Sequence, residues 1–318
     1  MTARVVLLGV LTAASALAQG TGEPTYDLTP HYTLGGELEG EARLGLELTV
    51  RIQVASQNLD HRSLQAQRIE RRFRDRVTEV RGGKIAAVER TYLEAFESQR
   101  LPGAAKFQRL ESPLSGRTLT VGLDAAGKRT VTVEGEPALQ PSDTEHEVHT
   151  ERYEAALPDA PVSVGDSWTW GGDRLRRAVG NGFGERPEGK LVCRFMEVKE
   201  EALDPELTPD AAPRRYAIVQ VDLETEGSLS SSDEGAPRMT CHLTGNLWFD
   251  LEERKLAKLE LQGQAHLESV EREGDAERRI TATGPLTVSK RFWFPRKPEP
   301  PEDAAPEGGE SGLPGPGR

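Results

Sequence analysis

The sequence predicts a mainly β fold: a curved antiparallel sheet, or a half-barrel, with one amphipathic helix packed on its apolar face. Several long segments alternate apolar and polar residues with the two-residue period of a strand that has one dry and one wet face. One segment in the first half instead spaces its apolar residues at three and four. The expected division is a signal peptide (1–18), an N-terminal linker (19–36), a β-rich half (37–170), an antiparallel β half (171–294) and a tail (295–318).

The first residues predict export. An apolar run from Val5 to Leu17 follows Arg4 and ends in Ala16-Leu17-Ala18, which is typical of a secretory signal peptide cleaved after Ala18. The run is too short to span a bilayer, and no later segment approaches a transmembrane segment in length and apolarity. No cysteine directly follows the cleavage site, so a lipoprotein is not indicated. We expect a secreted or periplasmic protein.

Charge and composition narrow the possible partners. The 318 residues carry a formal net charge of −12, which argues against general binding of nucleic acid, because that needs a cationic surface. The segment 295–318 is rich in Pro, Glu and Gly and cannot bury enough apolar surface to fold, so we expect it to be disordered.

The clearest strand lies between Gly40 and Ser56, where every even-numbered residue from 42 to 54 is apolar. The period then changes. The stripe that predicts a helix over 63–81 consists of Ala66, Ile69, Phe73, Val77 and Val80. As a strand, this segment would place Arg71 and Asp75 on the apolar face, and Ser63 and Gly82 suit the two ends of a helix.

The outer face of the expected helix is basic. It carries Arg68, Arg71, Arg72, Arg74 and Arg76. Such a face can lie on anionic lipid or on an acidic partner. The preferred interpretation is a solvated face with ion pairs between residues four apart, such as Glu70 with Arg74 and Arg71 with Asp75.

After the expected helix, 84–98 is predicted to be extended, 116–135 a hairpin and 144–157 a short helix. His146 and His149 in this last segment could share a metal with a neighbouring glutamate, although exposed histidines are the commoner explanation. In the second half, 190–199, 216–226, 238–251, 256–269 and 278–294 all alternate. The hairpin at 245–263 resembles the one at 116–135, which leaves open two related halves.

The two cysteines, Cys193 and Cys241, both fall on the apolar face of their strands. An exported pair usually forms a bridge, so we expect a Cys193–Cys241 disulfide, with two free buried thiols as the alternative.

Signatures of common enzymes are missing. The chain has no Gly-x-Ser-x-Gly elbow, phosphate-binding glycine loop, His-Glu-x-x-His pair or Cys-x-x-Cys motif. Acidic residues alternate with Lys and Arg on the wet faces of strands, so no carboxylate pair stands out for acid–base chemistry. We therefore expect a protein that is not an enzyme, with no cofactor and no metal.

One mid-chain stretch joins the two halves. It reads Leu-Pro-Asp-Ala-Pro-Val-Ser-Val-Gly-Asp-Ser-Trp from Leu157 to Trp168, and Ser-Pro-Leu-Ser-Gly precedes it at 112–116. The prolines end any helix by Leu157, and Gly165-Asp166 is typical of a tight turn. Trp168 and Trp170 would share one face of a strand, where two indoles more often seal a core than bind a ligand.

This stretch resembles a motif of a family of uncharacterised bacterial secreted proteins, in which Leu-Pro…Val-Gly-Asp-x-Trp lies between two β-rich halves. The resemblance implies no activity. The motif residues are taken as structural: Leu157, Pro158, Val164, Gly165, Asp166 and Trp168. In fold alone, a curved sheet with a helix on its apolar face is similar to the Lol-type lipoprotein carriers, and fold does not fix function.

Two functions remain open from the sequence. A long apolar sheet face covered by one helix, with few aromatic residues to fill the interior, predicts a binding module for an apolar or amphipathic small molecule such as a lipid. Alternatively the same surfaces close on one another, and the protein is a structural or interaction component of the bacterial envelope.

Overall fold

The computed structural model describes most of the chain between residues 24 and 294. The described ranges are 24–82, 84–124, 128–133, 139–140, 144, 152–180, 187–203, 212–228, 237–273 and 276–294. The expected signal peptide and the tail at 295–318 lie outside these ranges, as do His146 and His149.

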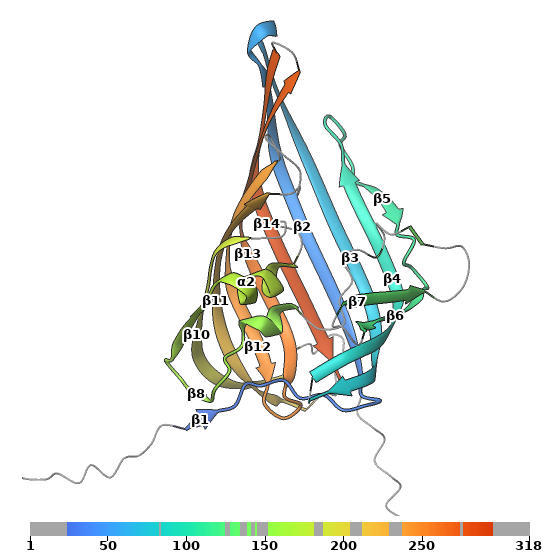
Figure 1. Cartoon of the computed structure of the whole chain (residues 1–318), viewed down its shortest axis with the longest axis vertical. Coiled ribbons are helices and arrows are strands. Elements are labelled where there is room, and N and C mark those ends of the chain that lie inside the picture. The colour runs from blue at the N-terminus through green and yellow to red at the C-terminus, as the bar shows by residue number, and fades with distance from the viewer. Residues whose placement is uncertain are drawn as a thin grey trace, which may run out of the picture.

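One antiparallel sheet of 12 strands dominates the molecule (Figure 1). Its order is β7-β6-β4-β3-β2-β14-β13-β12-β11-β10-β9, with β5 on β4, and the end strands β7 and β9 do not pair with each other. The strands of its first half are β2 (Glu37–Val54), β3 (Leu59–Arg81), β4 (Lys84–Arg100), β5 (Gln108–Glu111), β6 (Thr118–Leu123) and β7 (Arg129–Val133). The others are β9 (Ser167–Trp170), β10 (Glu188–Glu201), β11 (Arg214–Ser228), β12 (Arg238–Asp250), β13 (Lys255–Glu273) and β14 (Ala276–Trp293).

The sheet is curved, and short helices lie on its concave side (Figure 1). They are the 3-10 helix η2 (Arg152–Ala156) and α2 (Gly172–Val179), the one complete α-helix among the described residues. We call these two elements the helix layer. A third helical turn, η1 (Ala55–Gln57), joins β2 to β3 at the far end of the sheet. The prediction of a mainly β fold, an open curved antiparallel sheet with one helix, is confirmed.

The position predicted for the helix was wrong. Residues 63–81 belong to β3, which is the longest strand at 23 residues. Ile69, Phe73 and Val77 do share their face with Arg71 and Asp75, the arrangement that had made a strand look unfavourable. Asp75 is tolerated there because both of its carboxyl oxygens accept hydrogen bonds of 2.7 Å from Arg90 of β4. Arg90, the partner that allows Asp75 on the apolar face of a strand, lies on the next strand and 15 residues away in the sequence.

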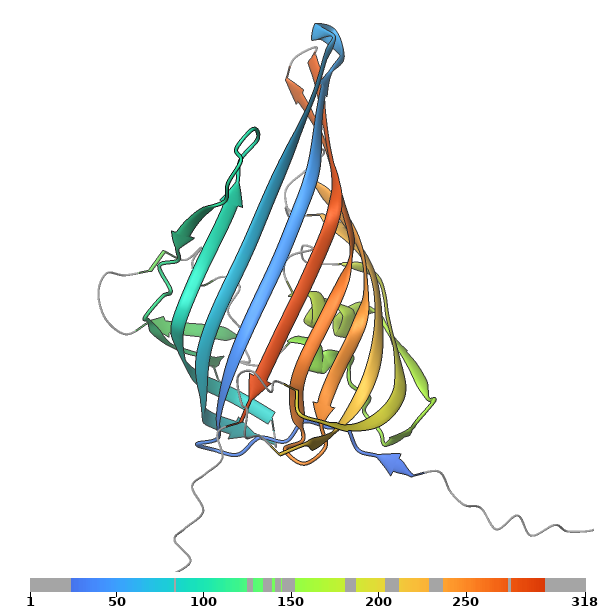
Figure 2. The same cartoon turned by 180° about the vertical axis from the view of Figure 1, so that it is seen from behind.

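The two expected halves share the same sheet, because β14 pairs with β2 over the full length from Glu39↔Trp293 to Val54↔Arg278. Figure 2 shows the two strands side by side at the centre of the outer face. The two hairpins that suggested a duplication differ in size, since β6 and β7 have 6 and 5 residues while β12 and β13 have 13 and 19. The hairpins therefore give no support for related halves.

The expected linker at 19–36 is part of the fold where it is described. Strand β1 (Thr25–Tyr26) pairs with β8 (Val162–Ser163), and Leu28 and Tyr32 are buried. Each belongs to a different hydrophobic cluster. Leu28 lies in a cluster formed by the helix layer with β10–β14, and Tyr32 lies in a second cluster with residues of β3, β4 and β6. This segment therefore closes one end of the concave side.

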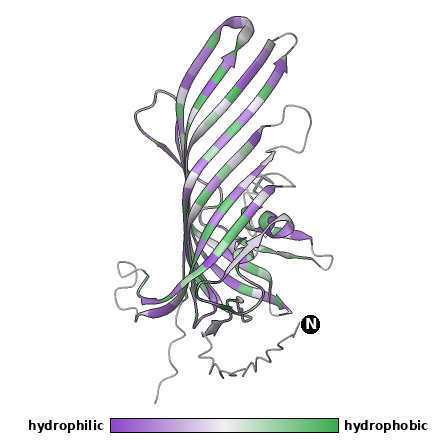
Figure 3. Ribbon diagram, turned by 90° about the vertical axis from the view of Figure 1, so that its left-hand side faces the viewer, coloured by the Kyte–Doolittle hydropathy of each residue, from purple (hydrophilic) through white to green (hydrophobic). Residues whose placement is uncertain are grey.

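Three glycines allow neighbouring strands to approach closely in the middle of the sheet. Gly245, Gly263 and Gly284 lie on successive strands, β12, β13 and β14. A Cβ atom at each position would lie 1.8 Å from a carbonyl oxygen of the neighbouring strand. Only glycine permits so close an approach of two backbones. Figure 3 shows the alternating hydropathy along the long strands of the sheet.

We expect Gly263→Ala to destabilise the protein by about 2 kcal/mol or more, because the new methyl group would collide with the carbonyl oxygen of His242. Chemical denaturation monitored by circular dichroism measures this. The matched control is Gln262→Ala on the exposed outer face, which should change the free energy of unfolding by less than about 0.5 kcal/mol. Equal effects of the two substitutions would contradict the role given to the glycine.

Candidate functional site: the trough on the concave face

The concave face of the sheet, which we call the trough, is apolar along β2. Alternate residues of this strand face the helix side, and we call five of them the apolar strip: Leu44, Leu46, Leu48, Val50 and Ile52. The register places Val288, Leu286, Gly284, Ala282 and Ile280 of β14 beside them. Because glycine and alanine stand beside Leu48 and Val50, the strip is flanked there by small side chains.

The apolar strip is covered unevenly. Leu44 and Leu46 pack against the cluster under the helix layer, whose central members on the neighbouring strands, Leu247 and Leu259, have no exposed surface. Leu48 and Ile52 keep part of their surface accessible to solvent, and so does Ile69 of β3. No described element packs over this end of the strip, which extends beyond the helix layer toward η1 (Figure 1). Among the described residues, the strip is therefore covered at the end we call sealed, under the helix layer, and partly exposed to solvent at Leu48 and Ile52.

Two cations lie near the sealed end. Lys290 of β14 and Arg71 of β3 flank Ala42 of β2 in the same row across the sheet. The Lys290 ammonium lies 5.5 Å from the centre of the Tyr153 ring of η2, and the Arg71 guanidinium lies 5.8 Å from the centre of the Tyr92 ring. Both side chains are half-buried. The next residue of β2 on the same face as Ala42 is Leu44, the first residue of the apolar strip.

Sequence reasoning missed both cations. Arg71 had been placed on the solvent face of a helix, whereas in β3 it shares the concave face with Ile69 and Phe73. Lys290 interrupts an alternating row of small and apolar residues at 282, 284, 286, 288 and 292. This single cation in an otherwise apolar row was the feature of the sequence that could have pointed to Lys290.

A carboxyl group is enclosed between the two hydrophobic clusters. Glu154 of η2 accepts a hydrogen bond from the hydroxyl of Tyr32. Burial raises its pKa from the ordinary 4.5 to about 8, and attraction to Lys255 opposes this rise only in part. Burial likewise lowers the pKa of Lys255, against the attraction of Glu253 and Asp250. Burial therefore favours the protonated, uncharged form of Glu154 more than in an ordinary glutamate.

The motif of the mid-chain stretch attaches the helix layer to the sheet edge. The indole nitrogens of Trp168 and Trp170 both donate to the carbonyl oxygen of Ala156 in η2, at 2.7 and 3.2 Å. Arg174 of α2 stacks on Trp170 at 3.8 Å and donates to the carbonyl oxygens of Ala155 and Leu157. One short strand thus orients both helices.

The remaining motif residues form the turn that leads into this strand. Gly165 has a φ of 97°, and its N–H donates to the carbonyl oxygen of Phe195, while Phe195 N–H donates to that of Asp166. The Asp166 carboxylate accepts from the N–H of Ser163 at 2.8 Å. Leu157 and Pro158 are buried, and Val164 is exposed. These contacts are structural.

The expected Cys193–Cys241 disulfide is absent from the structure. Cys193 and Cys241 are free and buried. Cys193 of β10 aligns through Val221 of β11 with Gly245 of β12, which lies four residues from Cys241. Two strand spacings and a four-residue offset place the Cα atoms about 16 Å apart, whereas a disulfide needs less than about 7 Å. The two cysteines do face the same apolar layer, but they are too far apart along it to form a disulfide.

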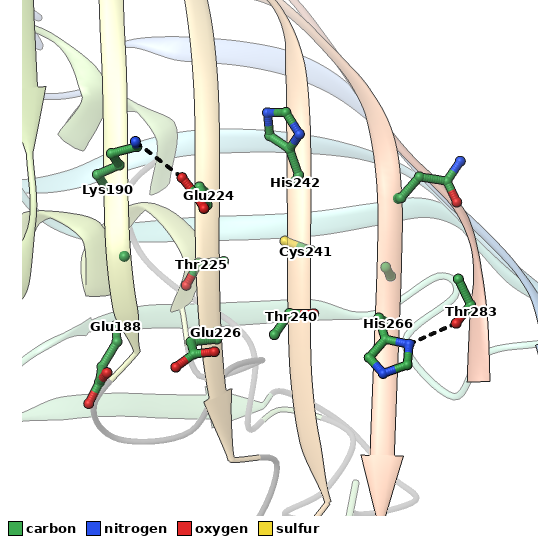
Figure 4. Close-up of a pocket in the computed structure, with 13 residues that line it drawn as sticks. Glu188, Lys190, Glu224, Thr225, Glu226, Thr240, Cys241, His242, His266 and Thr283 are labelled. Carbon is green, nitrogen blue, oxygen red and sulfur yellow. Dashed lines mark hydrogen bonds and ion pairs between the residues drawn. The ribbon is translucent and has the colours of Figure 1, made fainter. Parts of the chain in front are cut away.

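A second hollow lies on the outer face, opposite the trough. It has a volume of about 590 Å³, and its walls are polar side chains of β10–β14 (Figure 4). Lys190 pairs with Glu224 at 3.2 Å, His266 lies 2.7 Å from Thr283, and His242 lies 2.9 Å from Asp222. Among the described residues, no group of three His, Cys, Asp or Glu is placed to hold a metal. Because Lys190, His242 and His266 already have partners within the fold, the hollow is the weaker candidate.

The arginines of β3 do not form an open basic patch. Arg68, Arg72, Arg74 and Arg76 lie on the outer face, and Glu39 of β2 pairs with Arg74 at 2.5 Å and Arg72 at 3.8 Å. For Arg72 and Arg74 the structure shows a solvated face with ion pairs, whereas Arg71, predicted on the same face, lies on the concave side. The pairs run across strands, however, and not between residues four apart.

No protein-family model matches the chain, and no curated protein matches its sequence. Within the described part of the chain, no helix has the length and apolar character needed to cross a bilayer.

Both thiols should be free in purified protein. Titration with a thiol reagent in denaturant, without reductant, should find two per chain. In the folded protein both should react slowly, because burial raises the pKa of each to about 12 and suppresses the thiolate. Finding no titratable thiol in the denatured chain would mean that the cysteines are oxidised.

The enclosed Glu154 should make stability depend on pH. Its folded-state pKa is raised, so its contribution is present below about 4.5 and is lost as the pH rises to about 8. Glu154→Gln keeps an acceptor for Tyr32 but cannot ionise. The melting temperature of this variant should therefore rise relative to that of the native protein between pH 5 and pH 9, by about 2 °C or more. A difference that does not change with pH would show that Glu154 ionises normally.

Proposed function

We propose that the protein is an exported binding module without catalytic activity, which holds a lipid-like molecule in the trough. The observation that carries this proposal is the part of the apolar strip beyond the helix layer, where Leu48 and Ile52 stay partly exposed to solvent while Val50 between them is buried. Apolar surface of this kind is unfavourable in water, and concave apolar surfaces are where small ligands bind.

The geometry supports a lipid in preference to a compact ligand. Beyond the helix layer, from Leu48 to Ile52, the strip covers five residues, or roughly 14 Å of extended strand. An acyl chain fills one leaflet of a bilayer core, about half of its ~30 Å. A single chain therefore fits along the strip, with its length parallel to β2.

Export and family membership are parts of the same proposal. The N-terminal apolar run with Ala16-Leu17-Ala18 supports a location outside the cytoplasm. The Leu157–Trp168 motif supports a relation to the secreted family described above. An open curved sheet with a helix on its concave side supports the similarity in fold to the Lol-type carriers, which is an analogy of architecture and not of ligand.

The direct test is native mass spectrometry of the full chain purified from an exporting bacterial host, followed by organic extraction of the sample. We expect adducts with the mass of a lipid, which the extract then identifies. A chain of apo mass, together with no change in melting temperature on adding fatty acids or phospholipids, would reject the binding module. That outcome would favour the alternative, a structural or interaction component of the envelope.

A pair of variants locates the ligand. Leu48→Asp places a charge on the apolar strip outside the hydrophobic clusters, and we expect it to lower the affinity for a fluorescent fatty acid at least tenfold. The control Thr49→Asp adds the same charge to the exposed outer face of the same strand. It should leave binding within about twofold of the native protein. Equal losses in both variants would place the ligand elsewhere.

A further inference from the structure

The loop between β4 and β5 presents apolar side chains to solvent. It reads Leu-Pro-Gly-Ala-Ala-Lys-Phe over 101–107 and protrudes at the end of β4 (Figure 2). Leu101 is 57% exposed, and Lys106 is exposed without an ion pair among the described residues. The tip is a turn in which Ala104 N–H donates to the carbonyl oxygen of Leu101 at 3.0 Å. A Cβ on Gly103 would meet no atom within 4 Å, so the space around the tip is open.

Arginines stack on aromatic rings at the base of this loop. The guanidinium of Arg68 on β3 lies 4.2 Å from the centre of the Phe107 ring, and that of Arg100 on β4 lies 5.3 Å from it. The guanidinium of Arg109 on β5 lies 3.6 Å from the centre of the Phe96 ring. Arg68 and Arg109 share one row across the outer face of the sheet. A guanidinium that stacks on a ring keeps N–H groups at its edge, where they can donate to a phosphate.

Carboxylates on the same face offset part of this positive charge. They belong to Glu47, Glu70 and Glu111. Glu47 pairs with Arg100 at 3.1 Å, and Glu70 lies 3.9 Å from Arg109. Arg68 has an aromatic ring but no carboxylate as its partner among the described residues. Since the chain as a whole carries −12, attraction to an anionic surface has to come from such a local group of cations.

We propose that this loop docks the protein on a bilayer surface that contains anionic phospholipid. Leu101 enters the interface, and Arg68 and Lys106 lie beside the lipid phosphates. Exposed apolar side chains next to cations match the two parts of such a surface, the acyl chains and the anionic headgroups. An acidic protein would match the cations alone. The inference goes beyond the proposed function and does not rest on a ligand in the trough.

The test is flotation of the purified protein with vesicles of two compositions, pure phosphatidylcholine and a mixture of phosphatidylcholine with phosphatidylglycerol. We expect at least tenfold stronger binding to the anionic vesicles, and this preference should shrink as salt is raised. The apolar run at 5–17 could itself enter vesicles, so the protein is taken from an exporting host and its N-terminus is checked by mass. Binding to the neutral vesicles reports any contribution from that run.

Two variants with matched controls locate the contact. Leu101→Asp should weaken binding to anionic vesicles at least tenfold, because it removes apolar surface and adds a repelled charge, whereas Leu34→Asp adds the same charge at another exposed leucine. Arg68→Gln should weaken it about fivefold. Its control, Arg76→Gln, lies on the same face of β3 but eight residues away, roughly 27 Å, which is more than a Debye length. Both controls should stay within about twofold of the native protein, and thermal melting establishes that every variant is folded.

Each outcome decides the proposal separately from the proposed function. Equal binding to the two kinds of vesicle would overturn it, and so would binding to neither, which would favour an acidic protein as the partner of these cations. A preference for anionic vesicles that survives in both Leu101→Asp and Arg68→Gln would place the contact elsewhere on the molecule. None of these results bears on a lipid held in the trough, which mass spectrometry detects without vesicles.

Discussion

The pairing of β2 with β14 is the interaction on which the rest of the structure depends. It joins residues more than 200 positions apart and turns two sets of strands into one sheet. Phe292 of β14 packs against both hydrophobic clusters, and its ring lies 6.3 Å from that of Phe73. A Cβ on Gly40, between these two rings, would lie 2.6 Å from Phe73. Such long-range pairing is slow to form, because loop closure must precede the contacts that compensate for it.

The interior of this sheet is not uniformly apolar, and its polar groups are matched across elements. Asp75 and Arg90 belong to adjacent strands, whereas Tyr32 and Glu154 connect the N-terminal segment to the helix layer. A buried polar group without a partner would cost more than a hydrogen bond contributes, so each match restricts where its element can pack. The helix layer is fixed in the same way, through the two indoles that share the carbonyl oxygen of Ala156.

Much of the sheet could be predicted from the sequence, because alternation is a local property of a strand. The strand expected at 238–251 is β12, Arg238–Asp250, and the one expected within 40–56 is β2. Strand β3 could not be predicted, because Asp75 on its apolar face is stable there only when Arg90 of the next strand binds its carboxylate. The prediction of a disulfide was wrong for a related reason. Alternation shows which face of its strand a cysteine occupies, but the distance between two cysteines depends on the order of the strands and on their offset along them. The cations Lys290 and Arg71 become neighbours only through β2, so the candidate site was visible only in its apolar part.

Because the sheet does not close, it has two edge strands, and neither offers a long free edge with which a strand of another chain could pair. The end strands β9 and β7 are four and five residues long, so an incoming strand finds few free backbone groups. Where β10 extends past β9, a bulge lies between Phe195 and Glu197, and the exposed residues that follow include Lys199 and Glu200. Short, bulged and charged edges discourage edge-to-edge association. The described edges of this open sheet therefore leave little backbone on which a strand of a second molecule could add.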